Sequence, residues 1–93
     1  MRAEREVPRL ARGMRLRQDH QAREGRWVVL GPERMFVPDD IALEVLRLMD
    51  GARSLGAIVD DLAARFDAPR AEILADVAAM LDDLAAKGVV TAG

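Results

Sequence analysis

The spacing of hydrophobic residues changes once along this 93-residue chain, at Pro38. Before Pro38, apolar residues alternate with charged ones or form short β-branched runs, which is typical of strands. After Pro38, they recur three and four positions apart, which is typical of amphipathic helices. A chain of this length has room for one core. We therefore expect an α+β fold in which the strands come first and the helices follow.

Three short strands are expected before Pro38. The expected order is a strand from residue 14, a polar turn at 20–25, a strand at 26–30, a turn at 31–33 and a strand at 34–38. In the first strand, Met14 and Leu16 share one face, and Arg15 and Arg17 share the other. Because short turns join neighbouring strands, the sequence predicts an antiparallel meander whose third strand lies at the edge.

Three helices are expected after Pro38. They run from the N-cap candidates Asp39 and Asp40 to Gly51, from a cap at Ser54 through residue 66, and from Pro69 to Lys87. The inward residues of the third helix follow the helical spacing; they are Ile73, Val77, Met80, Leu81 and Leu84. A short extended tail at Val89-Val90 closes the chain. Three helices with an attached small sheet predict a winged helix-turn-helix outline.

The N-terminal residues and the apolar runs suggest the domain bounds and the cellular location of the protein. Residues 1–7 have no apolar periodicity and are expected to form a flexible arm or a linker stump, so that residues 8–93 are one domain. No secretory signal and no apolar run of membrane-spanning length are present. We expect a cytoplasmic monomer that does not bind a membrane.

Few side chains suited to catalysis are available. The chain holds one His, one Lys, one Ser and one Thr, at His20, Lys87, Ser54 and Thr91, and it has no Cys, Tyr or Asn. A nucleophile with its base, or a zinc site with three or four ligands, cannot be assembled from this set in any familiar way. We expect no catalytic residue, no metal and no cofactor, with His20 solvated in a polar turn.

Charge is distributed unevenly. Residues 1–37 hold nine Arg and five acidic residues, whereas residues 54–93 hold three bases and seven acids. A winged helix suggests DNA binding, but the third helix carries more carboxylates than bases and would repel phosphates. A regulator that binds DNA through the basic front remains an alternative function. As a hypothesis, Arg15 and Arg17 steer the chain toward an acidic partner surface.

Three segments together resemble one family. They are WVVLGPER (27–34), the helix end LMDG (48–51) and FDAPRAEI (66–73), and the resemblance extends over about residues 8–90. The chain is similar to the PqqD family of pyrroloquinoline quinone biosynthesis. The resemblance implies a non-catalytic chaperone with a winged-helix-like fold. It would bind the precursor peptide PqqA and present it to the radical S-adenosylmethionine enzyme PqqE. Some members are fused behind the oxidase PqqC.

The resemblance and the exposed strand edge suggest where a peptide would bind. An edge strand beside a helix can accept a guest strand through main-chain hydrogen bonds, although charge or proline can also simply protect such an edge. The expected peptide-binding residues lie on the third strand and on one flank of the third helix; they are Arg34, Met35, Phe36, Val37, Pro38, Val77, Met80, Leu81 and Leu84.

Overall fold

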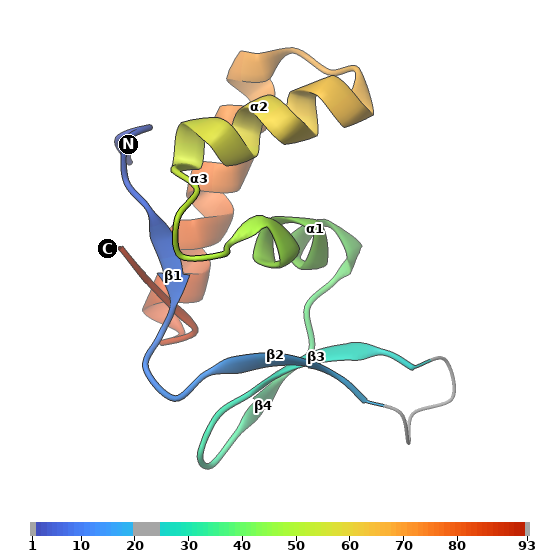
Figure 1. The fold of residues 1–93 in the computed structure, drawn as a ribbon, viewed down its shortest axis with the longest axis vertical. Helices are drawn as coiled ribbons and strands as arrows, with labels where there is room; N and C mark the ends of the chain where they lie inside the picture. The colour runs from blue at the N-terminus through green and yellow to red at the C-terminus, as the bar shows by residue number, and fades with distance from the viewer. Residues whose placement is uncertain (1, 20–24, 93) are drawn as a thin grey trace.

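The computed structural model describes residues 2–19 and 25–92. The elements, in chain order, are β1 (Pro8–Leu10), β2 (Arg15–Gln18), β3 (Trp27–Leu30), β4 (Met35–Phe36), α1 (Asp40–Leu48), α2 (Leu55–Phe66), α3 (Arg70–Ala86) and β5 (Val90–Ala92). The helices lie above one face of the sheet made by β2, β3 and β4 (Figure 1). This confirms the expected α+β fold with a three-stranded antiparallel sheet followed by three helices. His20, expected in a polar turn, lies outside the described residues.

The three-stranded sheet has a core-facing side and an outer side. Its order is β2-β3-β4, and both pairs are antiparallel. Since side chains alternate along a strand, the cross-strand partners sort into two rows. The core-facing row is Leu16, Val29 and Phe36, and the outer row is Arg15, Leu30 and Met35. The alternation expected from Met14 onward is confirmed.

β4 is shorter than the strand expected at 34–38. The amide of Gly31 donates to the carbonyl of Arg34 at 2.8 Å, so Arg34 belongs to the closing turn of the hairpin. Pro38 has no amide hydrogen and cannot continue the ladder. Only Met35 and Phe36 remain paired with β3.

Side-chain caps and left-handed residues define the helix ends. The carboxylate of Asp39 accepts from the amide of Ala42 at 2.7 Å, and the hydroxyl of Ser54 accepts from the amide of Ala57 at 3.1 Å. α2 ends at Asp67, whose φ of 48° is left-handed. Ser54 therefore caps a helix, as expected.

The core lies between the sheet and the helices, and α3 contributes its apolar stripe to it. Of the expected inward residues of α3, Val77, Leu81 and Leu84 are buried, while Ile73 and Met80 pack against the cluster from partly exposed positions. The remaining buried members come from the sheet, from α1 and α2, and from the segment after α3; they are Val29, Val45, Leu46, Leu55, Ile58, Val59, Leu62, Val89 and Val90. The helical periodicity therefore predicted the stripe correctly.

A second, two-stranded sheet was not expected. β1 pairs with β5 antiparallel, with Leu10 opposite Val90, so the two ends of the described chain lie together. The amide of Ala11 also donates to the carbonyl of Val89 at 2.8 Å. The extended segment expected at Val89-Val90 is thus paired and buried. A strand of three residues is too short to show a recognisable periodicity, and its partner strand is distant in sequence. The sequence therefore did not predict this pairing.

The described part of the expected flexible arm, residues 2–7, lies against α2 and α3. The carbonyls of Glu6 and Glu4 accept from the amides of Leu55 and Gly56 at 2.7 and 2.8 Å. These amides belong to the first turn of α2, and amides in a first turn have no acceptor within their own helix. Arg70 of α3 donates to the carboxylates of both Glu4 and Asp60. The arm thus supplies acceptors that α2 lacks, which a pattern of apolar residues cannot reveal.

We predict that Arg70→Met loosens this arm. The hydrogen bond from Arg70 holds the pKa of Glu4 below its ordinary value of 4.5. Because the pKa is lowered in the folded state, docking is stabilised above about pH 4.5 and weakens as the pH falls through the lowered pKa. In Arg70→Met, the amides of Leu55 and Gly56 should lose hydrogen-exchange protection at neutral pH, and the acid-dependent loss should disappear.

The matched control for this prediction is Arg65→Met. Arg65 also pairs with two carboxylates, those of Glu44 and Asp61, but neither belongs to the arm. Protection at Leu55 and Gly56 should therefore stay at the wild-type level in this variant. Equal protection in the two variants would show that the arm does not depend on Arg70.

Candidate functional site

The outer edge of β4 has no strand partner among the residues that the structure describes. Hydrogen-bonded and non-hydrogen-bonded pairs alternate along an antiparallel ladder. Gly31 and Arg34 form the bonded pair at the turn, so the Leu30–Met35 pair is non-bonded and the Val29–Phe36 pair is bonded. The amide and carbonyl of Met35 consequently point away from β3, toward the open edge.

A small cleft of about 160 Å³ separates β4 from the end of α3. Its walls come from β4, the segment before β2, β3 and the C-terminal end of α3; they are Met14, Val29, Arg34, Met35, Phe36, Lys87 and Val89. The Nζ of Lys87 lies 5.9 Å from the centre of the Phe36 ring. The guanidinium of Arg34 lies beside Gly88, where an added Cβ would collide with it. Two cations therefore stand at this cleft.

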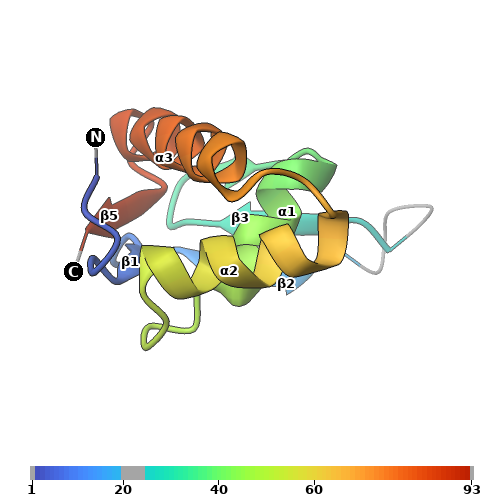
Figure 2. The same ribbon diagram turned by 90° about the horizontal axis from the view of Figure 1, so that it is seen from above.

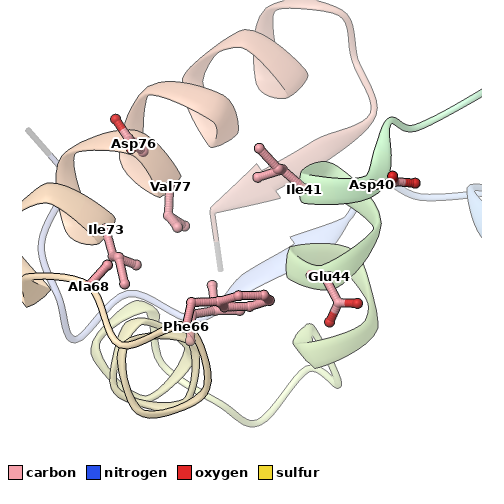
Figure 3. Close-up of a pocket in the computed structure, with 9 residues that line it drawn as sticks. Asp40, Ile41, Glu44, Phe66, Ala68, Ile73, Asp76 and Val77 are labelled. Atoms are coloured by element: carbon pink, nitrogen blue, oxygen red, sulfur yellow. The ribbon is translucent and has the colours of Figure 1, made fainter.

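A larger apolar cavity of about 360 Å³ lies between α1, the end of α2 and the first half of α3. Figure 3 shows Ile41 of α1, Phe66 of α2 and Val77 of α3 around it. The rest of its apolar lining comes from Leu62, Ala68 and Ile73. Its acidic lining residues are Asp40, Glu44 and Asp76. In Figure 3 the carboxylates of Asp40 and Asp76 point outward from the cavity. The cavity thus has an apolar interior and an acidic mouth.

The two hollows lie at opposite ends of one side of α3. Figure 2 shows α3 running past α1 near its N-terminal half and past the β3–β4 hairpin near its C-terminal end. The chain from β4 to the start of α1 connects the same two places, because only residues 37–39 separate these elements. The edge of β4 and residues 37–39 therefore lead from the smaller cleft toward the larger cavity.

The residues expected at the peptide site fall into two groups. Arg34, Met35 and Val37 are exposed, and Phe36 and Pro38 are half-buried, so the strand residues are accessible. On α3, Met80 is half-buried, whereas Leu81 and Leu84 are sealed in the core and Val77 is reached only through the larger cavity. The assignment of these residues to peptide binding stays a prediction.

Two large apolar residues at the ends of helices are exposed. Ile41 is 66% exposed and Phe66 is 58% exposed, and both line the larger cavity. Each stands in a terminal turn, where a helix has few neighbours to cover an apolar side chain. In the sequence, their exposure is indicated only by their position, because each is a large apolar residue next to a helix boundary.

Fixed ion pairs neutralise part of the charge around these hollows. Glu44 at the larger cavity accepts from Arg65 at 2.9 Å, and Arg65 also donates to Asp61, so the pKa of Arg65 is raised above its ordinary value. Lys87 at the smaller cleft donates to Asp83 at 2.9 Å. Arg34, Asp40 and Asp76 make no ion pair within the described ranges.

The exposed face of α3 is acidic, which disfavours the DNA-binding alternative. Glu72, Asp76, Asp82 and Asp83 are exposed on this helix. A recognition helix with this charge would repel the phosphate backbone.

No cluster of three or more metal-ligating side chains occurs within residues 2–19 and 25–92. None of the helices described is long and apolar enough to cross a membrane.

Known proteins match this chain in sequence and in structure. The family model described as "Coenzyme PQQ synthesis protein D (PqqD)" matches residues 26–90. A "PqqA binding protein" of Rhodopseudomonas palustris (strain HaA2) is 55% identical over 89 residues, which cover 96% of this chain and 85% of the relative.

Two solved structures share the fold. One is the solution structure of the PqqD truncation of Methylobacterium extorquens PqqCD, described as a recognition element for ribosomally synthesized and post-translationally modified peptides. It has 42% identity and a TM-score of 0.77, and the match covers 98% of this chain and 95% of that one. The other is the crystal structure of PqqD from Xanthomonas campestris, with 40% identity, a TM-score of 0.55 and 94% of each chain covered. The chain belongs to the PqqD family.

Proposed function

We propose that this chain binds the precursor peptide PqqA as an added strand on β4 and presents it to the radical S-adenosylmethionine enzyme PqqE. The observation that carries the proposal is the open backbone edge of β4 beside the cleft at the end of α3. An extended peptide gains main-chain hydrogen bonds from such an edge and specificity from adjacent pockets. The relatives named PqqA binding protein support the choice of guest.

Only alternate backbone groups of the edge can serve the guest. Met35 turns its amide and carbonyl outward, whereas Phe36 uses its own toward Val29. Val37 follows β4 directly and is exposed, so a guest strand can reach it as well. The side chain of Phe36 faces α3, and the side chain of Met35 faces the outer side of the sheet.

We also propose that the chain has no catalytic activity of its own and works in the cytoplasm. A recognition element leaves the chemistry to its partner enzyme, and the relative from Methylobacterium extorquens is described as such an element. Ser54 and Lys87, two of the few candidate side chains, are occupied by a helix cap and an ion pair. By analogy with PqqCD, we propose that association with PqqC is open to this chain.

We predict that Met35→Pro weakens PqqA binding more than it weakens the fold. Proline removes the outward amide of Met35, which no described strand uses. One lost hydrogen bond of about 1 kcal/mol corresponds to roughly fivefold weaker binding. Isothermal titration with PqqA measures the affinity, and thermal denaturation measures the stability.

Phe36→Pro is the matched control one residue away. It removes an amide that pairs with β3, so the hairpin itself should lose stability. If Met35→Pro bound PqqA as tightly as the wild type, the guest would not be using the β4 edge. Added exchange protection at 35–37 on binding would support it independently.

The outer side of the sheet is proposed to meet the modifying enzyme. Arg15, Leu30 and Met35 form one cross-strand row, with Leu30 41% exposed and Met35 52% exposed. Arg17 lies on the same side, opposite Val28. Val28 on this side is buried, but it is not a member of the cluster that packs against the helices. Exposed apolar residues flanked by arginines fit a partner surface that is apolar with acidic surroundings.

We predict that the double variant Arg15→Glu/Arg17→Glu associates with PqqE about tenfold more slowly at low salt. The difference should shrink as salt rises, because screening removes long-range attraction. Stopped-flow measurements at two ionic strengths test this. The control Arg5→Glu/Arg53→Glu changes net charge equally through exposed arginines elsewhere. If both doubles slowed association equally, net charge and not this side of the sheet would be responsible.

A further inference from the structure

The path along the β4 edge has opposite charge at its two ends. At the end of α3, Arg34 and Lys87 line the smaller cleft. Near the start of α1, Asp40 and Asp76 stand at the mouth of the apolar cavity. The larger cavity is lined mainly by apolar side chains, so a guest that reached both places would meet one kind of charge at each end.

Neither end is neutralised by its surroundings. Arg34 makes no ion pair with any described residue, so its charge is available even though Lys87 already contacts Asp83. At the other end Glu44 is bound to Arg65, but Asp40 and Asp76 have no cation beside them in the described chain. Each end therefore retains at least one uncompensated charge.

The distance between the ends matches a short extended peptide. Asp76 and Lys87 are eleven positions apart on one helix, which is about 16 Å at 1.5 Å per residue. An extended strand rises about 3.3 Å per residue, so about five residues cover the same length. This is also the separation along the chain from Arg34 to Asp40, within one residue.

We propose that the groove selects its guest by charge order: a basic group beside an apolar anchor at the Asp40–Asp76 end, and an acidic side chain about five residues away at the Arg34–Lys87 end. The proposal rests on the proposed function, because it describes the same bound peptide. The apolar anchor fills the cavity lined by Ile41, Phe66 and Val77. Antiparallel pairing, the more stable mode, places the basic and apolar residues on the N-terminal side of the acidic one.

Double-mutant cycles with synthetic PqqA test the charge order. One peptide has every carboxylate replaced by its amide, and a second has every amine acetylated and every arginine replaced by citrulline. Each is titrated against the wild type, against Arg34→Gln/Lys87→Gln and against Asp40→Asn/Asp76→Asn. Since Asp40 lies in the first turn of α1, Asp76→Asn is also measured alone. Glu72→Gln, exposed one turn away on α3 and outside both hollows, is its control.

The expected result is selective coupling. Removing the carboxylates of PqqA should weaken binding to the wild type by about two- to tenfold, and this loss should vanish in Arg34→Gln/Lys87→Gln. Removing its cations should couple in the same way to Asp40 and Asp76. The crossed combinations and Glu72→Gln should be additive.

Two failures are distinguishable. If unmodified PqqA binds the wild type but all cycles are additive, or if the couplings appear at the opposite ends, the charge order is wrong and the peptide site stands. If unmodified PqqA does not bind the wild type, the proposed function itself fails.

Discussion

The packing of α3 is the interaction on which the remaining structure depends. Its buried stripe at Val77, Leu81 and Leu84 joins the sheet and the other two helices in one core. Both ends of the helix are tied as well. Arg70 links its start to the arm and to α2, and the amide of Val89 donates to the carbonyl of Leu84 just beyond its end. A helix held along its length presents a fixed surface.

This arrangement is compatible with a strand as short as β4 serving as the proposed peptide-binding edge. Exposed edges invite unwanted pairing, and proteins commonly limit them by keeping them brief and flanking them with charge or proline. β4 has two residues, with Arg34 before it and Pro38 shortly after. The same features leave a few outward backbone groups beside α3. Protection against random pairing is therefore compatible with the proposed acceptance of one short guest beside this helix.

In the folded structure, the charged residues are sorted onto separate surfaces. The basic front of the sequence becomes the outer side of the sheet, at Arg15 and Arg17, and one end of the groove, at Arg34. The acidic back becomes the exposed face of α3 and the mouth of the apolar cavity. Ion pairs such as that between Arg65 and Glu44 then remove some charges from consideration. Net charge alone distinguishes none of these surfaces.

The sequence by itself determined the local elements, because their causes are local. Alternation gave the arginine side of β2, Ser54 and Asp39 gave the helix caps, and apolar spacing gave the buried stripe of α3. The three sequence segments WVVLGPER, LMDG and FDAPRAEI also sufficed to suggest the family. Only the tertiary structure decided the pairing of β1 with β5, the docking of the arm on α2, and the exposure of Ile41 and Phe66. It also decided which amide of β4 faces outward and where the cavity lies. These features depend on which distant segments meet, and that is set by packing across the whole chain rather than by any pattern within one element.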